Sequence, residues 1–343
     1  MRLLLCSYYF IKSQFHHFPM QLYLNKPGCS ISVRDGQFLV RLKDTEDRFI
    51  AVSQVKAIHL NRAVRLSAEV IWMVTQHDID MLFVEKSGRP YARIWSNRFG
   101  SIATIRKQQV VFAASAAAVE WIKNLLILKM EQQELILAML PLGNQSFLVD
   151  KPMEKLRQSQ MRMRELSFES ISEGANTIRG IEANASKVYF RALSIVLPDM
   201  YRFNQRSQHP AMDMFNSLLN YAYGMLYGKV ESAMIRAGVD PTIGIFHADE
   251  YKRPVLVYDV IEQFRGWADF VVTNLCMQKV MYPEFFVVEN GTFYLDDMGK
   301  RMLIQAFTDY LDEIIVWEGL ERSLHTHIDL TAQRLATMFR TYS

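Results

Sequence analysis

The pattern of apolar residues changes near residue 100, and this change constrains the fold more than any other feature of the chain. Between residues 20 and 100, short apolar runs alternate with polar residues, as in ISVRDGQFLVRL, where Asp35-Gly36 is a hairpin signal. After residue 100, long segments have the spacing of helices, as in VEWIKNLLILKMEQQELILAML. We therefore predict an α+β protein, with a small N-terminal β-sheet domain over 20–100 and a larger all-helical domain over 101–343.

Several local signals refine this division. Inside the β-rich segment we expect one helix, Ser67 to Gln76, with Ser67 as its N-cap. Further helices are expected from Lys151 to Leu166 and from about Ala175 onward. Residues 1–19 do not join the strand pattern, and we expect them to be an appendage outside the fold.

Composition excludes several classes of protein. The three cysteines, Cys6, Cys29 and Cys276, lie far apart, so a disulfide framework is not expected and a reducing cytoplasm fits best. No apolar run reaches the roughly 20 residues that a membrane span needs. Neither G-x-G-x-x-G after a strand nor G-x-x-x-x-G-K-[ST] occurs, so nothing supports a dinucleotide or nucleoside-triphosphate site. The net charge of +3 neither demands nor excludes a nucleic-acid partner.

The first chemically unusual segment is GIEANASKVYF, residues 180–190. On a helix, Glu182, Ala185, Ser186 and Tyr189 share one face, and the small residues leave space beside the acid. An ordinary surface glutamate would produce the same pattern.

The second and third segments lie close together in the sequence. An apolar run delivers His247 at its end, and a neutral imidazole can act there as a metal ligand or a general base. The run after Pro254 is interrupted by Asp259 and, one helical turn later, by Glu262. Burying a carboxylate is costly without a compensating cation, so a structural salt bridge to Arg265 is the alternative interpretation.

One histidine with two or three carboxylates forms a hard set of oxygen and nitrogen ligands. Such a set suits Mg²⁺ or Mn²⁺ better than structural zinc, which favours cysteine. These ions polarise phosphate oxygens and activate hydroxyl nucleophiles. The residues alone do not show that the three segments meet in space.

The run GVDPTIGIFHADEYKRPVLVYDVIEQFR resembles the CRISPR-associated spacer-acquisition integrase family, the larger subunit of the adaptation complex. GIEANASKVYF resembles the segment around that family's first metal-binding glutamate, and the run from Arg206 through Asn216 resembles its Arg-Pro-Asp-Asn helix. The order and the spacing of the motifs agree as well.

The resemblance implies an N-terminal β-domain, a helical catalytic domain, a homodimer and a small ferredoxin-like partner subunit. It implies a DNA integrase of CRISPR adaptation that also has endonuclease activity. The implied metal ligands are Glu182, His247 and Glu262, with Asp259 as an accessory catalytic acid. This chain departs from the family pattern at Glu262, where many members have Asp, and at Lys252-Arg253 and Gly266.

We also expect a basic path for DNA around the site. Lys187 and Arg191 extend from the Glu182 helix, and the stretch from Tyr201 to Arg206 interleaves rings with cations in a pattern suited to stacking and phosphate contact. A loop with buried rings is the alternative for that stretch, and Arg265 could instead orient Glu262. The predicted DNA contacts are Lys187, Tyr189, Arg191, Arg202, Arg206, Lys252, Arg253 and Arg265.

Two other functions share these features. A general metal-dependent nuclease acting in repair would use the same ligands, with water in place of a DNA 3′-hydroxyl. A non-catalytic DNA-binding scaffold would not need the acids and the histidine.

Overall fold

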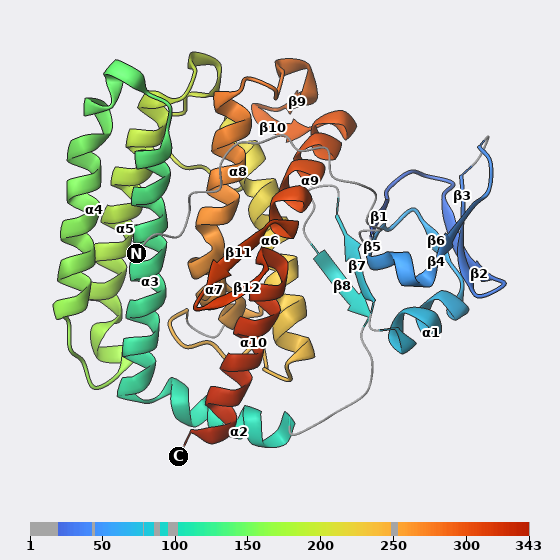
Figure 1. Cartoon of the computed structure of the whole chain (residues 1–343), viewed down its shortest axis with the longest axis horizontal. Coiled ribbons are helices and arrows are strands. Elements are labelled where there is room, and N and C mark those ends of the chain that lie inside the picture. Colours follow the sequence, from blue (N-terminus) through green and yellow to red (C-terminus); the bar gives the residue numbers. More distant parts are fainter. Residues whose placement is uncertain are drawn as a thin grey trace. The chain divides into compact units, whose positions relative to one another are not determined.

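The computed structural model describes residues 20–42, 45–77, 79–85, 90–94, 102–247 and 253–342 (Figure 1). The chain divides into two compact units, Met1–Phe99 and Gly100–Ser343. The first unit holds two β-sheets and the second is mostly helical, which confirms the predicted class. The predicted appendage over 1–19 lies outside the described residues.

Among its described residues, the first unit contains two four-stranded sheets. The sheet of order β1-β5-β7-β8 is parallel except at its last pair and comprises β1 (Met20–Leu24), β5 (Val55–Asn61), β7 (Asp80–Val84) and β8 (Pro90–Ile94). The other has the order β4-β3-β2-β6 and comprises β4 (Arg48–Ala51), β3 (Gln37–Arg41), β2 (Ser30–Arg34) and β6 (Arg65–Leu66).

The structure contains both features predicted from local sequence in this unit, the Asp35-Gly36 turn and the helix after Ser67. Asp35 and Gly36 have φ angles of 51° and 69°, the left-handed conformation that a tight turn between β2 and β3 requires. Helix α1 (Ala68–Gln76) begins one residue after Ser67, as predicted. The Ser67 side chain makes no capping hydrogen bond, however, so the helix start relies on the burial of Val70 and Val74.

The second unit is built from nine α-helices among the residues described. They are α2 (Ile102–Ala113), α3 (Ala116–Met139), α4 (Phe147–Glu165), α5 (Ile171–Val196), α6 (Met214–Arg236), α7 (Val255–Ile261), α8 (Arg265–Met277), α9 (Asp297–Asp312) and α10 (Leu324–Thr341). Helices α3, α4 and α5 pack side by side, and α6 contacts α7, α8 and α10 (Figure 1). A one-turn 3₁₀ helix, η4 (Glu262–Phe264), joins α7 to α8.

The helical unit is not helical throughout, so the prediction of an all-helical domain is wrong in this respect. Two hairpins follow α8: β9 (Phe286–Glu289) with β10 (Thr292–Leu295), and β11 (Ile314–Trp317) with β12 (Leu320–Ser323). Each turns through two residues of positive φ, Asn290-Gly291 and Glu318-Gly319. The Asn-Gly pair is a strong hairpin signal that the helical spacing around it obscured.

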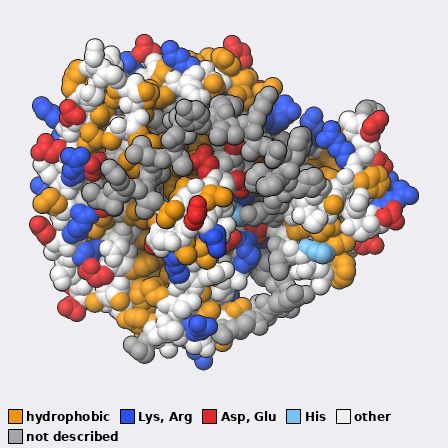
Figure 2. Space-filling model, in the orientation of Figure 1, with side chains coloured by type: hydrophobic (Ala, Val, Ile, Leu, Met, Phe, Trp, Pro, Cys, Tyr) orange, Lys and Arg blue, Asp and Glu red, His pale blue; other side chains and the backbone are white. Residues whose placement is uncertain are grey.

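The surface view shows charges of both signs. On the face in Figure 2, Lys and Arg side chains alternate with Asp and Glu over the helical unit, without one continuous basic stripe. Among the described helices, none alone is long and apolar enough to cross a membrane. Helices α2 and α3 pass that test only as a pair bent by 86°, and α3 buries much of its apolar surface in the core of this unit.

Candidate metal centre

The predicted ligands Glu182, His247 and Glu262 belong to three different elements of the helical unit. Glu182 lies near the middle of α5, Glu262 opens η4, and His247 lies in the segment between α6 and α7. The structure brings the two glutamates to one point, where both contact the same cation.

That cation is the ammonium of Lys129 on α3. Its Nζ lies 2.5 Å from Glu182 Oε1 and 2.6 Å from Glu262 Oε2, and its side chain is only 9% exposed. Burial lowers the pKa of Lys129, but the two carboxylates outweigh this effect and raise it above the ordinary value. Lys129 was not among the predicted site residues. The signal available was a lysine within the buried stripe of a long apolar helix.

Glu262 is a buried carboxylate held in its ionised form. Arg265 Nε donates to its Oε1 at 2.8 Å. Burial alone would raise the pKa of Glu262, but Arg265 and Lys129 together lower it to about 2. Apart from the ion pair with Lys129, its Oε2 has no hydrogen-bond partner among the described residues. Glu262 Oε2 is therefore a charged oxygen whose only partner among the described residues is the Lys129 ammonium.

Asp259 orients His247 rather than facing the site. Its carboxylate accepts hydrogen bonds from the backbone N–H groups of Ile245, Phe246 and His247, and its Oδ1 lies 2.6 Å from His247 Nδ1. A carboxylate acceptor places the proton on Nδ1, which leaves Nε2 as the free ligand nitrogen. With its side chain fully buried and all four contacts used, Asp259 holds the histidine segment in place, and its role as an accessory catalytic acid stays a prediction.

Arg179 ties the histidine segment to the helix that carries Glu182. Its guanidinium donates to the Phe246 carbonyl at 2.8 Å and lies 4.9 Å from the centre of the Phe246 ring. Arg179 stands one turn before Glu182 on α5, so one helix positions the first carboxylate and the loop of the imidazole. Ser186, one turn after, donates to Glu182 Oε1 at 2.9 Å.

A buried polar cluster adjoins Glu262 through Arg265. Tyr223 donates to Asp269 Oδ1 at 2.5 Å, and the Arg265 guanidinium lies 4.6 Å from the centre of the Tyr223 ring. Burial raises the pKa of Asp269 to about 6. Arg206 donates to the side chains of Asn216 and Asn220, which fixes it inside the fold.

The predicted DNA contacts divide into two groups. Tyr189 is fully buried and Arg206 and Arg265 are committed to internal partners, so the structure corrects the prediction that they face DNA. Lys187, Arg191, Arg202 and Arg253 are exposed, whereas Lys252 lies outside the described residues.

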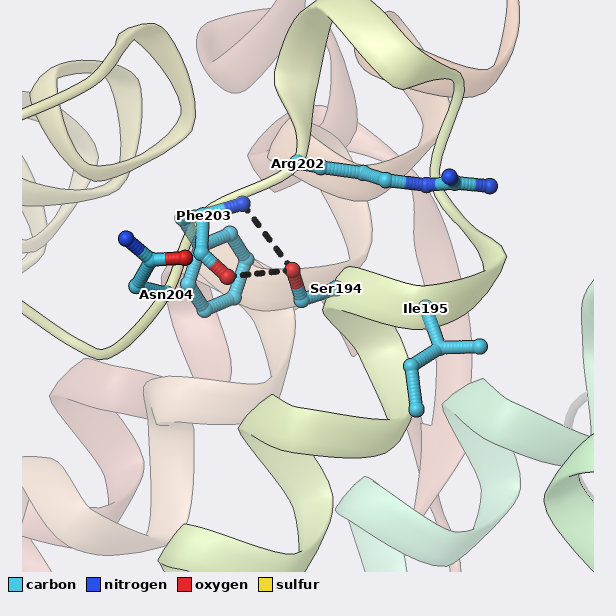
Figure 3. Close-up of a pocket in the computed structure, with 5 residues that line it drawn as sticks. All are labelled: Ser194, Ile195, Arg202, Phe203 and Asn204. Carbon is cyan, nitrogen blue, oxygen red and sulfur yellow. Dashed lines mark hydrogen bonds between the residues drawn. The ribbon is translucent and has the colours of Figure 1, made fainter.

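The stretch from Tyr201 to Arg206 takes the alternative interpretation, a loop with buried rings. Tyr201 is fully buried and Phe203 is 8% exposed, so neither ring is free to stack on a base. Ser194 on α5 fixes the loop, because its hydroxyl bonds both the N–H and the C=O of Phe203 (Figure 3). Arg202 extends away from Ser194 in the same view.

The described residues contain no group of three His, Cys, Asp or Glu side chains arranged to hold a metal ion as they stand. At the candidate centre the ammonium of Lys129 lies between the two glutamates instead. The chemistry available is that of two carboxylates that share a compact positive charge, and of an imidazole that Asp259 orients.

Several known proteins are similar to this chain over most of its length. A curated relative from Archaeoglobus fulgidus, named CRISPR-associated endonuclease Cas1 1, is 26% identical over 334 residues, covering 94% of this chain and 96% of the relative. A solved structure titled "Casposase bound to integration product" superposes with a TM-score of 0.79 at 20% identity, covering 94% of this chain and 91% of that one.

A chain of a second solved structure, titled "Cas6-RT-Cas1–Cas2 complex", superposes with a TM-score of 0.76 at 18% identity. The match covers 95% of this chain and 35% of that one. The family model described as "CRISPR associated protein Cas1" matches residues 22–309, which is most of the chain. The protein therefore belongs to the Cas1 family of CRISPR-associated proteins.

Proposed function

We propose that this protein is a metal-dependent DNA integrase of CRISPR adaptation, with an associated endonuclease activity. It inserts short DNA fragments into a CRISPR array by attack of a 3′-hydroxyl on a phosphodiester. The observation that carries the proposal is the convergence of Glu182 and Glu262 from separate elements on one buried cation, together with an imidazole that Asp259 orients.

The residues present fit a divalent cation. Among the described residues, Glu262 Oε2 is a buried carboxylate oxygen paired only with Lys129, and the contact of His247 Nδ1 with Asp259 leaves Nε2 to act as a ligand. Carboxylate and imidazole ligands suit Mg²⁺ or Mn²⁺. Glu182, His247 and Glu262 would hold the ion, which polarises phosphate oxygens and offsets transition-state charge when bound.

The chain's own residues position the proposed ligands and supply charge to the site. Arg265 holds Glu262, and Asp259 holds His247 with its ligand nitrogen outward. In the reaction, the 3′-oxygen of the incoming fragment forms the new P–O bond, and the array's 3′-oxygen leaves and takes up a proton. No covalent enzyme intermediate is required, so the site needs no nucleophilic side chain.

We place the DNA over exposed cations near the site. Lys187 and Arg191 lie on α5 after Glu182, and Arg253 lies just before α7. Such cations raise the affinity for DNA by neutralising phosphates. These contacts carry little information about the DNA sequence. Binding through them weakens steeply as salt concentration rises.

The comparisons support the reaction class and the partners. The Archaeoglobus relative is named an endonuclease, the casposase of the same fold was solved with an integration product, and another chain of this fold stands in a Cas1–Cas2 complex. We further propose that this protein acts as a homodimer, through its β-sheet unit, with a small ferredoxin-like partner subunit.

A strand-transfer assay tests the proposal. The purified protein, with and without the partner subunit, is incubated with a short duplex bearing 3′-hydroxyl ends, a supercoiled plasmid carrying a CRISPR array, and Mn²⁺ or Mg²⁺. We expect metal-dependent branched products that Glu262→Gln abolishes. Glu131→Gln, which changes a glutamate on α3 that is 46% exposed and pairs with Arg164, serves as the matched control and should remain active.

The products distinguish integration from hydrolysis. Nicking of the plasmid without joining, even with the partner present, would contradict the integrase proposal and favour a nuclease that uses water. Joining that persists in Glu262→Gln would contradict the assignment of the site.

A further inference from the structure

Lys129 stands where the proposed function needs a metal ion. Its Nζ makes ion pairs with one oxygen of Glu182 and one oxygen of Glu262 at 2.5 and 2.6 Å. These are contact distances for an ammonium, and the lysine side chain is only 9% exposed. The lysine therefore bridges the two proposed ligands from inside the fold.

An ammonium and a divalent ion cannot use the same two oxygens at once. A Mg²⁺ or Mn²⁺ ion on these carboxylates would lie about 2.0–2.2 Å from each oxygen, which places it against Nζ. Like charges at such a distance in a partly buried site repel strongly. The flexible four-carbon stem of lysine lets its charge move away, which the planar fork of arginine does less readily.

The backbone that carries Glu262 is held independently of the lysine. One turn after Lys129, Gln132 donates to the Gln263 carbonyl at 2.8 Å and accepts from the Gly266 N–H at 3.2 Å. A Cβ at position 266 would lie 2.4 Å from Gln132 Oε1, so a side chain larger than hydrogen would disturb this clamp. Glu262 therefore keeps its backbone position when Lys129 moves.

We propose that Lys129 is a built-in counter-cation that holds Glu182 and Glu262 together in the metal-free protein and is displaced from them when the divalent ion binds. It is a positioning residue that sets the metal affinity of the centre. The inference rests on the proposed function, because it takes these glutamates as ligands.

Two effects of removing this charge oppose each other. Without metal, the two carboxylates lose their shared partner, and an uncompensated buried charge destabilises the fold. With metal, no internal cation competes for the oxygens, so the ion binds more tightly. A merely structural salt bridge away from the metal would produce the first effect without the second.

The test measures Mn²⁺ affinity by electron paramagnetic resonance titration and the thermal midpoint in a chelator. Lys129→Met keeps an unbranched side chain, one atom shorter, without its charge, and Lys129→Arg keeps the charge. The matched control is Lys123→Met, because Lys123 lies on the same helix with a side chain 4% exposed and pairs with Glu120, not with the proposed ligands.

We expect Lys129→Met to have a lower midpoint without metal and to bind Mn²⁺ roughly tenfold more tightly or better. Lys129→Arg should restore weak binding. Lys123→Met should lower the midpoint while its Mn²⁺ affinity stays within about twofold of wild type. Unchanged or weaker Mn²⁺ binding by Lys129→Met, while Glu182→Ala removes binding, would overturn the role of Lys129 alone. Mn²⁺ binding that survives Glu182→Ala and Glu262→Ala would overturn the metal site itself.

A second measurement uses the wild-type protein and needs no variant to fold. Amine acetylation followed by mass spectrometry reports the accessibility of each lysine with and without Mn²⁺. We expect the acetylation of Lys129 to rise when Mn²⁺ is added, while that of buried Lys123 stays constant. An unchanged Lys129 would show that the ammonium is not displaced.

Discussion

Replacing Asp259 by asparagine changes one atom and tests how the imidazole of the site is held. Asp259 Oδ2 accepts from the N–H groups of Ile245 and Phe246 at 2.9 and 3.0 Å, and Oδ1 accepts from His247 N and Nδ1 at 3.1 and 2.6 Å. All four partners present hydrogens, so the amide NH₂ of an asparagine must face two donors in either orientation.

The magnitude follows from the lost bonds. A hydrogen bond to a charged group contributes about 1.5–3 kcal/mol, so losing two costs roughly 3–6 kcal/mol. For a unit of this size each kcal/mol shifts the melting temperature by about 2–4 °C. We therefore expect Asp259→Asn to lower the midpoint by about 10 °C or more.

The assay is thermal unfolding followed by circular dichroism in a chelator. Asp199→Asn is the matched control, because its carboxylate is 88% exposed and pairs only at the surface with Arg202. We expect that control to stay within about 2 °C of wild type. An Asp259→Asn protein that also melts within 2 °C of wild type would refute the view that this carboxylate anchors the His247 segment.

Three further predictions concern stability and DNA binding. Because the folded-state pKa of Glu262 is lowered to about 2, its ionisation stabilises the fold above pH 4.5. This contribution, about 3 kcal/mol, is lost as the pH falls from 4.5 toward 2, and Glu262→Gln should lack that part of the acid dependence in urea titrations. Tyr201→Phe should lower the free energy of unfolding by about 1 kcal/mol, because its hydroxyl donates to the Met281 carbonyl at 2.8 Å; an unchanged value in urea titrations would contradict this role. Lys187→Gln with Arg191→Gln should leave the midpoint unchanged and reduce the salt dependence of DNA binding by about two charges in filter-binding titrations, and an unchanged slope would remove this face of α5 from the DNA path.

The sequence predicted the two-part class and the elements around the ligands well. Strand alternation, the Asp35-Gly36 turn and the long helical periods are local signals, and local signals are what one sequence contains. The hairpin at Asn290-Gly291 was missed although its turn residues signal it, because the helical spacing on both sides dominated the interpretation.

The site was predicted less completely because its contacts are distant in sequence. Lys129 lies 53 residues from Glu182, and no spacing rule joins a lysine on one helix to a glutamate on another. Tyr189 shares a helical face with Glu182, as predicted, but that face also carries Ala185 and packs into the core. The helical period shows which residues share a face of the helix. It does not show whether that face points to the core or to solvent, so Tyr189 was assigned to DNA although it is buried.

The most direct test of the account is an anomalous difference map from crystals of the protein soaked in Mn²⁺. The account predicts a peak coordinated by Glu182, Glu262 and Nε2 of His247, with the Lys129 ammonium moved off both carboxylates. A peak elsewhere, or none at this position while the soaked protein still joins DNA, would contradict the assignment of these three residues as the metal ligands.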